Sequence, residues 1–141
     1  GARVVAGGVR ANPEGAPDAY FFAPTILSDV DESVRIVREE QFGPALPVLK
    51  YESVEEAVAR ANDTEYGLGA SVWGSDVSDA ADVASKMQAG SIWINSHLGS
   101  GLDIDAPFGG IKESGIGKEG GGTLGFKAYC DEKYLYTPTS R

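Results

Sequence analysis

The stretch that decides the fold reads LPVLKYESVEEAVARANDTEYGLGASVWGSDVSDAADVASKMQAGSIWIN and covers residues 46–95. Near its start, Ser53 is followed three residues later by Glu56, so that each side chain can satisfy the other's free backbone N–H. The apolar residues after this capping box share one helical face, at Val54, Ala57, Val58 and Ala61. The pattern therefore predicts a strand over 46–51 followed by an amphipathic helix.

The same stretch continues with a second strand and a second helix. Residues 69–74 have strand composition, Ser75 or Asp76 is expected to cap the next helix, and Gly90 is expected to stop it. Residues 91–95 are apolar on both faces, as in a strand covered by helices on both sides. The buried stripe of the helix is predicted at Val77, Ala80, Ala81, Ala84 and Met87. The order strand, helix, strand, helix, strand predicts an α/β fold with a parallel sheet.

Toward the N-terminus, the residues predict three further elements. Short strands are expected over 3–6 and 20–27, where β-branched and aromatic residues alternate with turn formers. A short helix is expected over 33–38, because two valines recur there at helical spacing. The segment Phe42-Gly43-Pro44 stops that helix, because proline cannot continue it.

Toward the C-terminus, the regular pattern breaks. Ten of the 19 glycines lie between residues 99 and 125, and long loops of this kind in compact domains are usually functional. A short amphipathic turn is expected over 123–129. Residues 134–137 have strand composition and precede a polar tail.

Composition limits the class of protein. The 141 residues include 21 acidic and 12 basic side chains, a net charge of −9, and their number suits a single domain. Nucleic acids and anionic membranes select for basic patches, so neither is expected as a partner. The single cysteine, Cys130, excludes an internal disulfide framework and suits a cytoplasmic protein, and with His97 as the only histidine no metal site is expected. Because the chain begins without methionine, we expect it to be a piece of something longer.

One glycine motif invites a nucleotide-binding interpretation. Residues 115–120, GIGKEG, have the G-x-G-x-x-G spacing of a dinucleotide-binding turn. That turn requires a buried strand immediately before its first glycine, whereas the polar residues 112–114 precede it here. The Walker pattern also fails, because Lys118 is followed by Glu119 instead of serine or threonine. The alternative is that these glycines let two backbones pass closely.

A second unusual motif is EEQFGP, residues 39–44, in which two carboxylates precede an aromatic residue and a forced turn. A carboxylate there could accept two hydrogen bonds from a ribose diol, and the ring could pack on a flat heterocycle. The alternative is a solvated acidic pair at a helix end.

Four blocks of the sequence together resemble the C-terminal part of the NAD(P)-dependent aldehyde dehydrogenase superfamily. They occur in the order and approximate spacing of that family, and the similarity covers nearly the whole chain. The blocks are EEQFGP (39–44), NDTEYGL (62–68), AGSIWIN (89–95) and PFGGIKESG (107–115). The resemblance implies a parallel-sheet half of the catalytic domain over residues 1–127 and an oligomerisation strand and tail over 128–141.

The resemblance also implies roles for individual residues. Glu40 matches the glutamate that binds the nicotinamide-side ribose of NAD or NADP, and Phe42 matches an aromatic residue that positions the nicotinamide. Phe108 matches a wall of the aldehyde tunnel. Glu119 matches a glutamate considered a proton-relay participant. Asn95, at a strand end beside the pocket, is expected to hold loop backbone and is a candidate for the substrate site; His97 and Leu98 lie in a variable segment and cannot be assigned.

The family's central chemistry lies outside this chain. Its reaction uses a cysteine thiolate to attack the aldehyde and a glutamate to activate water, and both precede this segment. Cys130 matches neither role, and we interpret it as a small half-buried side chain, a dyad with His97 being unsupported. The chain is thus expected to be the C-terminal fragment of an aldehyde dehydrogenase, inactive alone and forming homo-oligomers through residues 134–137. The alternative is a non-catalytic α/β binding or assembly module.

Overall fold

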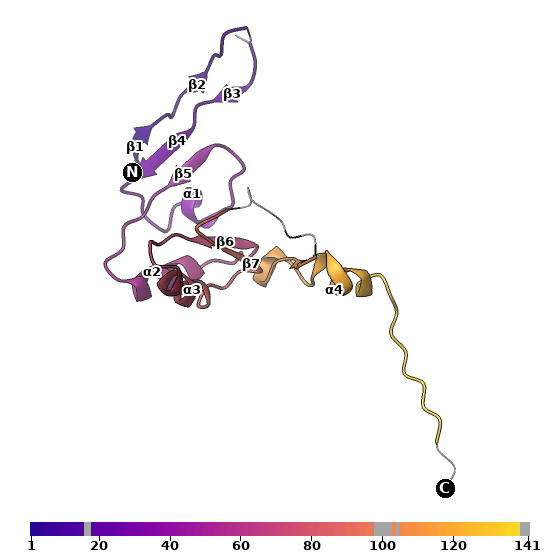
Figure 1. Ribbon diagram of the computed structural model, residues 1–141. Coiled ribbons are helices and arrows are strands. Elements are labelled where there is room, and N and C mark those ends of the chain that lie inside the picture. Colours follow the sequence, from indigo (N-terminus) through magenta and orange to yellow (C-terminus); the bar gives the residue numbers. More distant parts are fainter. Residues whose placement is uncertain (16–17, 98–102, 104, 139–141) are drawn as a thin grey trace. The chain divides into compact units, whose positions relative to one another are not determined.

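The computed structural model describes residues 1–15, 18–97, 103 and 105–138 (Figure 1). Contacts between Cα atoms divide the chain into two units, Gly1–Glu52 and Ser53–Arg141. Within the described residues, no helix is both long and apolar enough to cross a membrane.

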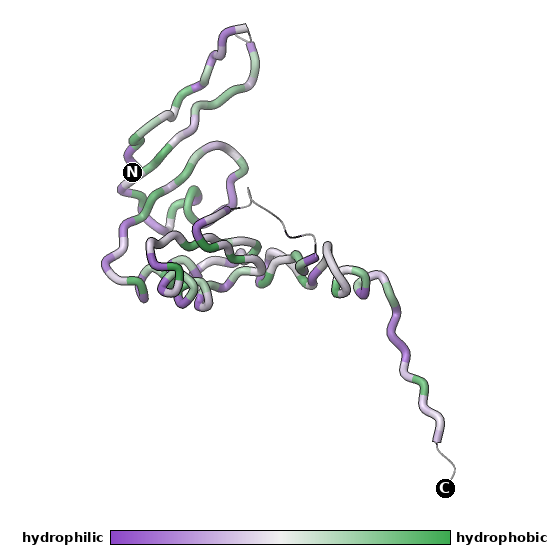
Figure 2. The backbone as a smooth tube through the Cα atoms, in the orientation of Figure 1, coloured by the Kyte–Doolittle hydropathy of each residue, from purple (hydrophilic) through white to green (hydrophobic). Residues whose placement is uncertain are grey.

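The first unit is built on a three-stranded sheet of order β1-β4-β5. Strands β1 (Arg3–Ala6) and β4 (Thr25–Ser28) are antiparallel, and β4 is parallel to β5 (Ala45–Pro47). The short helix α1 (Arg35–Arg38) lies in the crossover between the two parallel strands. Figure 2 shows hydrophobic segments along β1 and β4, which match the β-branched composition predicted for strands.

The extended stretch predicted over 20–27 is interrupted in the structure. Strand β3 (Phe21–Phe22) pairs with β2 (Arg10–Ala11) in a separate two-stranded sheet, and β4 begins only at Thr25. Thr25 is buried, and its hydroxyl accepts from the Gly8 N–H (2.8 Å) and donates to the Ala23 carbonyl (2.8 Å). This side chain therefore satisfies backbone groups at the break between the two strands.

The second unit contains a parallel pair and two helices. Strands β6 (Gly69–Val72) and β7 (Ser91–Ile94) are parallel, with helix α3 (Val77–Ala84) between them in the sequence, and α2 (Val54–Asn62) precedes them. A second, antiparallel pair joins β8 (Pro107–Phe108) to β9 (Glu119–Gly120). The 3₁₀ helix η1 (Lys112–Ser114) lies between these two strands, and α4 (Gly122–Lys127) follows them.

Both predicted helix starts are confirmed. The Ser53 hydroxyl accepts from the Glu56 N–H (3.1 Å), and the Asp76 carboxylate accepts from the N–H groups of Ser78 (2.8 Å) and Asp79 (3.1 Å). The face predicted for the first of these helices, α2, is only partly covered, because none of its residues is buried.

The prediction for the second helix is right in its centre and wrong at its ends. Ala80 and Ala84 are 4% and 7% exposed, whereas Val77, in the first turn, is 62% exposed. The helix ends at Ala84, well before Gly90. Gly90 instead makes a close backbone contact, because a Cβ there would overlap the Gly109 carbonyl oxygen.

The single parallel sheet predicted for residues 46–95 is not observed. Parallel pairing occurs twice, but β5 pairs with β4 while β6 pairs with β7, so the described strands fall into different sheets, two of them purely antiparallel. Strand β5 takes its parallel partner from β4, which precedes α1, and lies at the edge of that sheet among the described strands. The mixed α/β class and the order of these strands and helices along the chain are confirmed, but the described strands do not form the single parallel sheet that was predicted.

The predicted strand over 134–137 forms no ladder with any residue that the structure describes. Described residues 131–138 belong to no helix or strand, and the rings of Tyr134 and Tyr136 stack on each other at 6.5 Å. A strand requires a hydrogen-bonded neighbour, and the described residues of this chain place none beside this segment.

Candidate functional site

The first candidate region is the turn after α1. The Arg35 guanidinium donates two hydrogen bonds to the Glu39 carboxylate, from Nε to Oε1 at 2.7 Å and from Nη2 to Oε2 at 2.8 Å. These hydrogen bonds, with the charge of Arg35, hold the pKa of the Glu39 carboxyl below its ordinary value. Glu40 is exposed and has no hydrogen bond or ion pair with any residue that the structure describes. The two adjacent carboxylates are therefore not equivalent, because Arg35 holds Glu39 and not Glu40.

The same turn is braced so that it presents Phe42 to the outside. The Gln41 side chain accepts from the Gly43 N–H (3.1 Å) and donates to the Ala45 carbonyl. Phe42, beside it, is 94% exposed. An aromatic side chain held this openly on a braced turn has its whole face available to a flat ring.

The second candidate region is the antiparallel pair β8–β9. Its register places Phe108 directly opposite Glu119. The two residues that the sequence analysis assigned to the aldehyde tunnel and the proton relay are therefore neighbours across one ladder. Their sequence separation gave no sign of this pairing.

Phe108 is half-buried and lines two open pockets of the second unit. One, of about 260 Å³, also has Trp93, Ala106 and Pro107 in its wall. The other, of about 360 Å³, is lined by glycines of the 109–117 segment and by Lys118. Phe108 thus forms a shared wall, which suits the predicted contact with an apolar part of a substrate.

The Asn95 side chain is hydrogen-bonded to the backbone of Gly74. Its Oδ1 accepts from the Gly74 N–H and its Nδ2 donates to the Gly74 carbonyl, both at 2.8 Å. Its backbone has the left-handed φ of 51°, which asparagine tolerates better than most residues. These contacts agree with the expectation that Asn95 holds loop backbone.

The sequence analysis missed a set of residues that fasten three motif blocks together. The Gly67 N–H donates to the Ser114 hydroxyl (2.9 Å), and the Gly67 carbonyl accepts from the N–H groups of Gly90 (2.9 Å) and Ile111 (3.0 Å). The Lys112 ammonium closes the end of α2 by donating to two carbonyls, those of Asn62 (2.7 Å) and Thr64 (3.1 Å). The sequence contains one indication of these hydrogen bonds, which is that the residues that form them lie in or near the motif blocks.

The glycine motif at 115–120 does not form a dinucleotide-binding turn. The element before Gly115 is the 3₁₀ helix η1, and the motif ends in strand β9 instead of opening a helix. A Cβ added at Gly115 would lie 3.2 Å from the backbone of Gly110. The close passage of two backbones, the alternative interpretation, is therefore what the structure shows at this glycine.

The remaining candidates carry no chemistry that the structure supports. Cys130 is exposed, not half-buried as predicted, and its thiol contacts the Phe126 carbonyl at 3.5 Å. The His97 ring packs edge-on against Trp93 at 5.5 Å, and no contact joins it to Cys130 in the described part of the chain. Leu98 lies outside the described residues. Across the residues described, no group of three or more His, Cys, Asp or Glu is arranged to hold a metal ion.

Comparison with known proteins shows what these blocks belong to. The sequence model of the aldehyde dehydrogenase family matches residues 1–135. The chain is 46% identical over 118 residues to the geranial dehydrogenase of Castellaniella defragrans, covering 84% of this chain and 23% of that protein. It is 39% identical over 139 residues to the betaine aldehyde dehydrogenase of Bacillus subtilis, covering 99% and 28%. The chain thus spans roughly a quarter of the length of these relatives.

Solved structures agree. The Mycobacterium tuberculosis aldehyde dehydrogenase complexed with NAD+ superposes with a TM-score of 0.88 at 40% identity, over 98% of this chain and 27% of that one. Aldehyde dehydrogenase C of Pseudomonas syringae, a C291A mutant in complex with NAD+ and octanal, gives a TM-score of 0.81 at 45% identity, over 92% and 26%. With the four motif blocks and the family match over 135 of its residues, this chain belongs to the aldehyde dehydrogenase family.

Proposed function

We propose that this chain is the C-terminal part of an NAD(P)-dependent aldehyde dehydrogenase that oxidises an aldehyde to a carboxylic acid. Residues 1–127 are its share of the catalytic domain, and 128–141 are an oligomerisation strand and tail. The observation that carries the proposal is the turn after α1, where Arg35 holds Glu39 while Glu40, beside an exposed Phe42, has no hydrogen bond or ion pair with a described residue.

The chemistry of this turn fits a nicotinamide nucleoside. The two oxygens of the Glu40 carboxylate can accept hydrogen bonds from both hydroxyls of a ribose, and the Phe42 ring offers an apolar face to a pyridine ring. When bound, NAD(P)+ supplies the hydride acceptor. Neither contact involves the 2′-position of the adenosine-side ribose, where NADP+ carries its additional phosphate, so NAD+ and NADP+ are both compatible with this turn. Both solved structures compared above are complexes with NAD+, which favours NAD+ as the first cofactor to test.

On the substrate side, we propose that Phe108 forms one wall of the aldehyde site and that Glu119 passes a proton to or from the water path. The pocket of about 260 Å³ beside Phe108 and Trp93 has room for an alkyl or aryl group. Asn95 shapes this region by fastening the loop after β7 to Gly74. The octanal complex of the Pseudomonas syringae relative supports an aldehyde as the class of substrate.

We further propose that the 141 residues are inactive by themselves. The nucleophilic cysteine and the general-base glutamate of the family lie outside this chain, and exposed Cys130 has no base among its described contacts. The purified segment, mixed with an aldehyde and NAD+, should produce no NADH above a blank. Aldehyde-dependent NADH formation by the segment alone would refute this part of the proposal.

We propose that the protein is cytoplasmic. We also propose that its C-terminal segment pairs with a second copy of the same protein. Tyr134, Leu135 and Tyr136 are 85%, 81% and 72% exposed, and their backbone forms no ladder within the described chain. Such a segment is a template for strand addition. Deleting residues 134–141 from the full-length protein should lower its oligomeric state in light scattering; an unchanged molar mass would remove this role.

The test of the cofactor site uses two neighbouring carboxylates in the full-length protein. Glu40→Gln replaces a charged acceptor by a neutral one and should weaken NAD+ binding roughly five- to thirtyfold, because hydrogen bonds to charged groups are the stronger ones. Glu39→Gln is the matched control, since that carboxylate is already held by Arg35, and its dissociation constant should stay within about twofold. Equal dissociation constants for the two variants would remove Glu40 from the site.

A further inference from the structure

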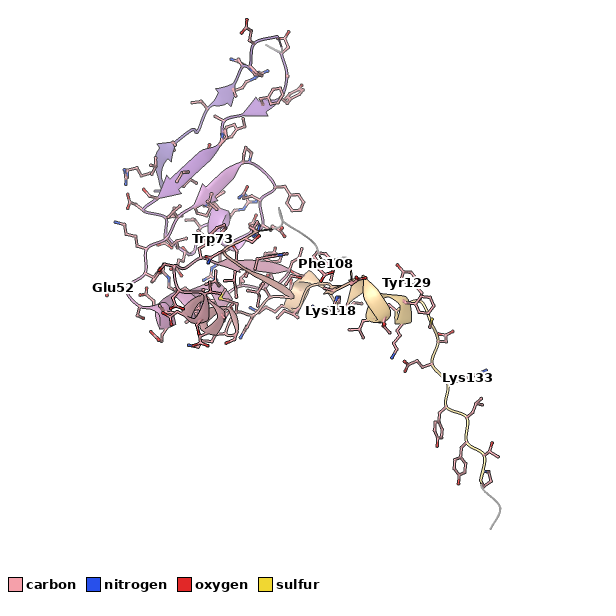
Figure 3. The ribbon with its side chains drawn as sticks, viewed as in Figure 1. Glu52, Trp73, Phe108, Lys118, Tyr129 and Lys133 are labelled. Atoms are coloured by element: carbon pink, nitrogen blue, oxygen red, sulfur yellow. The ribbon has the colours of Figure 1, made fainter. Side chains whose placement is uncertain are left out.

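The side chain of Lys118 reaches back across the second unit to the segment that carries Phe108. Its ammonium group donates to the Gly109 carbonyl, and its stem lies along the same glycine, with Cδ 3.3 Å from where a Cβ of Gly109 would be. The ammonium nitrogen is also 2.8 Å from a Cβ placed on Gly90. Phe108 and Lys118 lie in the same part of this unit (Figure 3). Lys118 is therefore hydrogen-bonded to the residue that follows β8, and its ammonium group lies near Gly90, the residue that precedes β7.

The ladder that this lysine closes is short. Strands β8 and β9 have two residues each, and the pairs are Pro107 with Gly120 and Phe108 with Glu119. Proline has no N–H to donate, and an isolated two-stranded pair is marginally stable. A slip of one residue would bring a neighbour of Glu119 opposite Phe108 and turn its side chain to the other face. Helix α4 packs against both strands, but the ladder's own few backbone hydrogen bonds do little to fix its register.

We infer that Lys118 is a positioning residue that keeps Glu119 opposite Phe108. Its ammonium group donates to the Gly109 carbonyl, directly after Phe108, and so fixes the register beside the pair of Phe108 and Glu119. The inference rests on the proposed function, because it gives Glu119 and Phe108 their roles. Lys118 itself needs no contact with aldehyde or cofactor, and its effect on the reaction passes through Glu119.

The test starts with Lys118→Met in the full-length enzyme, which keeps most of the stem and removes the donor. We expect kcat to fall roughly tenfold to a hundredfold, as small misplacements of a reacting group do. The dissociation constant for NAD+ should change by less than about twofold, because Glu40 and Phe42 belong to another part of the chain. Lys118→Arg retains a donor and should recover kcat to within about threefold of the wild type. Lys127→Met, at an exposed lysine ending α4, is the matched control and should behave as wild type.

A double-mutant cycle separates positioning from a general loss of structure. If Lys118 acts through Glu119, the pair Lys118→Met with Glu119→Gln should be no slower than Glu119→Gln alone. The acid or base limb of the kcat–pH profile that Glu119→Gln abolishes should also be lost in Lys118→Met. If the Met variant is insoluble, Lys118→Gln replaces it in the same cycle.

The inference would be overturned by a wild-type kcat in Lys118→Met, by effects of Lys118 and Glu119 substitutions that multiply, or by a failure of arginine to restore kcat. A Glu119→Gln enzyme with wild-type kcat would also overturn it, because no relay would remain to be positioned. Failure of the proposed cofactor site would look different, since it would appear as unchanged NAD+ binding in Glu40→Gln whatever residue stands at 118.

Discussion

Replacing Asn95 by alanine tests how the loop after β7 is held. The wild-type side chain makes two hydrogen bonds to Gly74, one to its N–H and one to its carbonyl, both at 2.8 Å. The residue also sits at a φ of 51°, where alanine is less favourable than asparagine. The substitution therefore removes both hydrogen bonds and adds a backbone cost at the same position.

The size of the effect follows from these two contributions. Each hydrogen bond is exposed and contributes about 0.5–1 kcal/mol net, and the left-handed backbone costs alanine about 1 kcal/mol. The sum, about 2–3 kcal/mol, lowers the free energy of local opening around Gly74. Since 1.4 kcal/mol corresponds to a factor of ten, the Gly74 amide should exchange roughly thirty- to a hundredfold faster.

The assay is native-state hydrogen exchange of the full-length protein, followed on peptides that contain Gly74. Asn95→Gly is the matched variant, because glycine adopts the left-handed conformation without cost and lacks both hydrogen bonds. It should exchange more slowly than Asn95→Ala by the backbone contribution alone, about fivefold. A Gly74 amide that exchanges at the wild-type rate in Asn95→Ala would refute the reasoning, and a glycine variant faster than the alanine variant would refute its division into two contributions.

Three further results are expected. Gly90→Ala places a Cβ on the Gly109 carbonyl oxygen and should lower the free energy of unfolding in urea by about 2 kcal/mol or more. Gly117→Ala, which has open space at its Cβ, should change that free energy by less than about 0.5 kcal/mol. Similar losses of stability in the two variants would contradict the close approach at Gly90. Ser53→Ala removes the cap of α2 and should increase amide exchange in its first turn by an amount equivalent to about 1 kcal/mol, so unchanged exchange would exclude a role for the cap. Arg35 lowers the pKa of the Glu39 carboxyl, so the stabilisation from this pair is present above the ordinary pKa of 4.5 and is lost as the pH falls through the lower folded-state pKa. Carboxyl NMR should show Glu39 titrating below 4.5 in the wild type and closer to 4.5 in Arg35→Gln. A wild-type midpoint at or above 4.5 would contradict this prediction.

The local elements could be predicted from the sequence because their causes are local. The caps at Ser53 and Asp76 each act over two or three residues, and both were found where the sequence placed them. The exposure of Val77 and the early end of α3 at Ala84 were not predicted. Both depend on which neighbouring surfaces cover the helix, which its own period does not contain.

In the candidate site, too, some features could be predicted from the sequence and others depend on tertiary contacts. The unusual carboxylates and ring of residues 39–44 were visible as a motif, and the family resemblance selected Glu40, but only the structure showed that Arg35 holds Glu39. The hydrogen bond from Gly67 to Ser114 joins residues 47 positions apart, and no periodicity points to it. The pairing of Phe108 with Glu119 likewise required the register of a two-residue ladder.

By itself, the sequence determined the helix starts, the mixed α/β class, the order of four family blocks and the identity of the side chains that could bind a nucleoside. Only the tertiary structure decided which strands pair, which of two adjacent glutamates Arg35 holds, and that Lys118 closes the ladder between Phe108 and Glu119. The physical reason is one of range. Caps and helical faces arise from interactions within a few residues, whereas strand partners, registers and backbone crossings at glycines depend on contacts between segments that the chain brings together only when it folds.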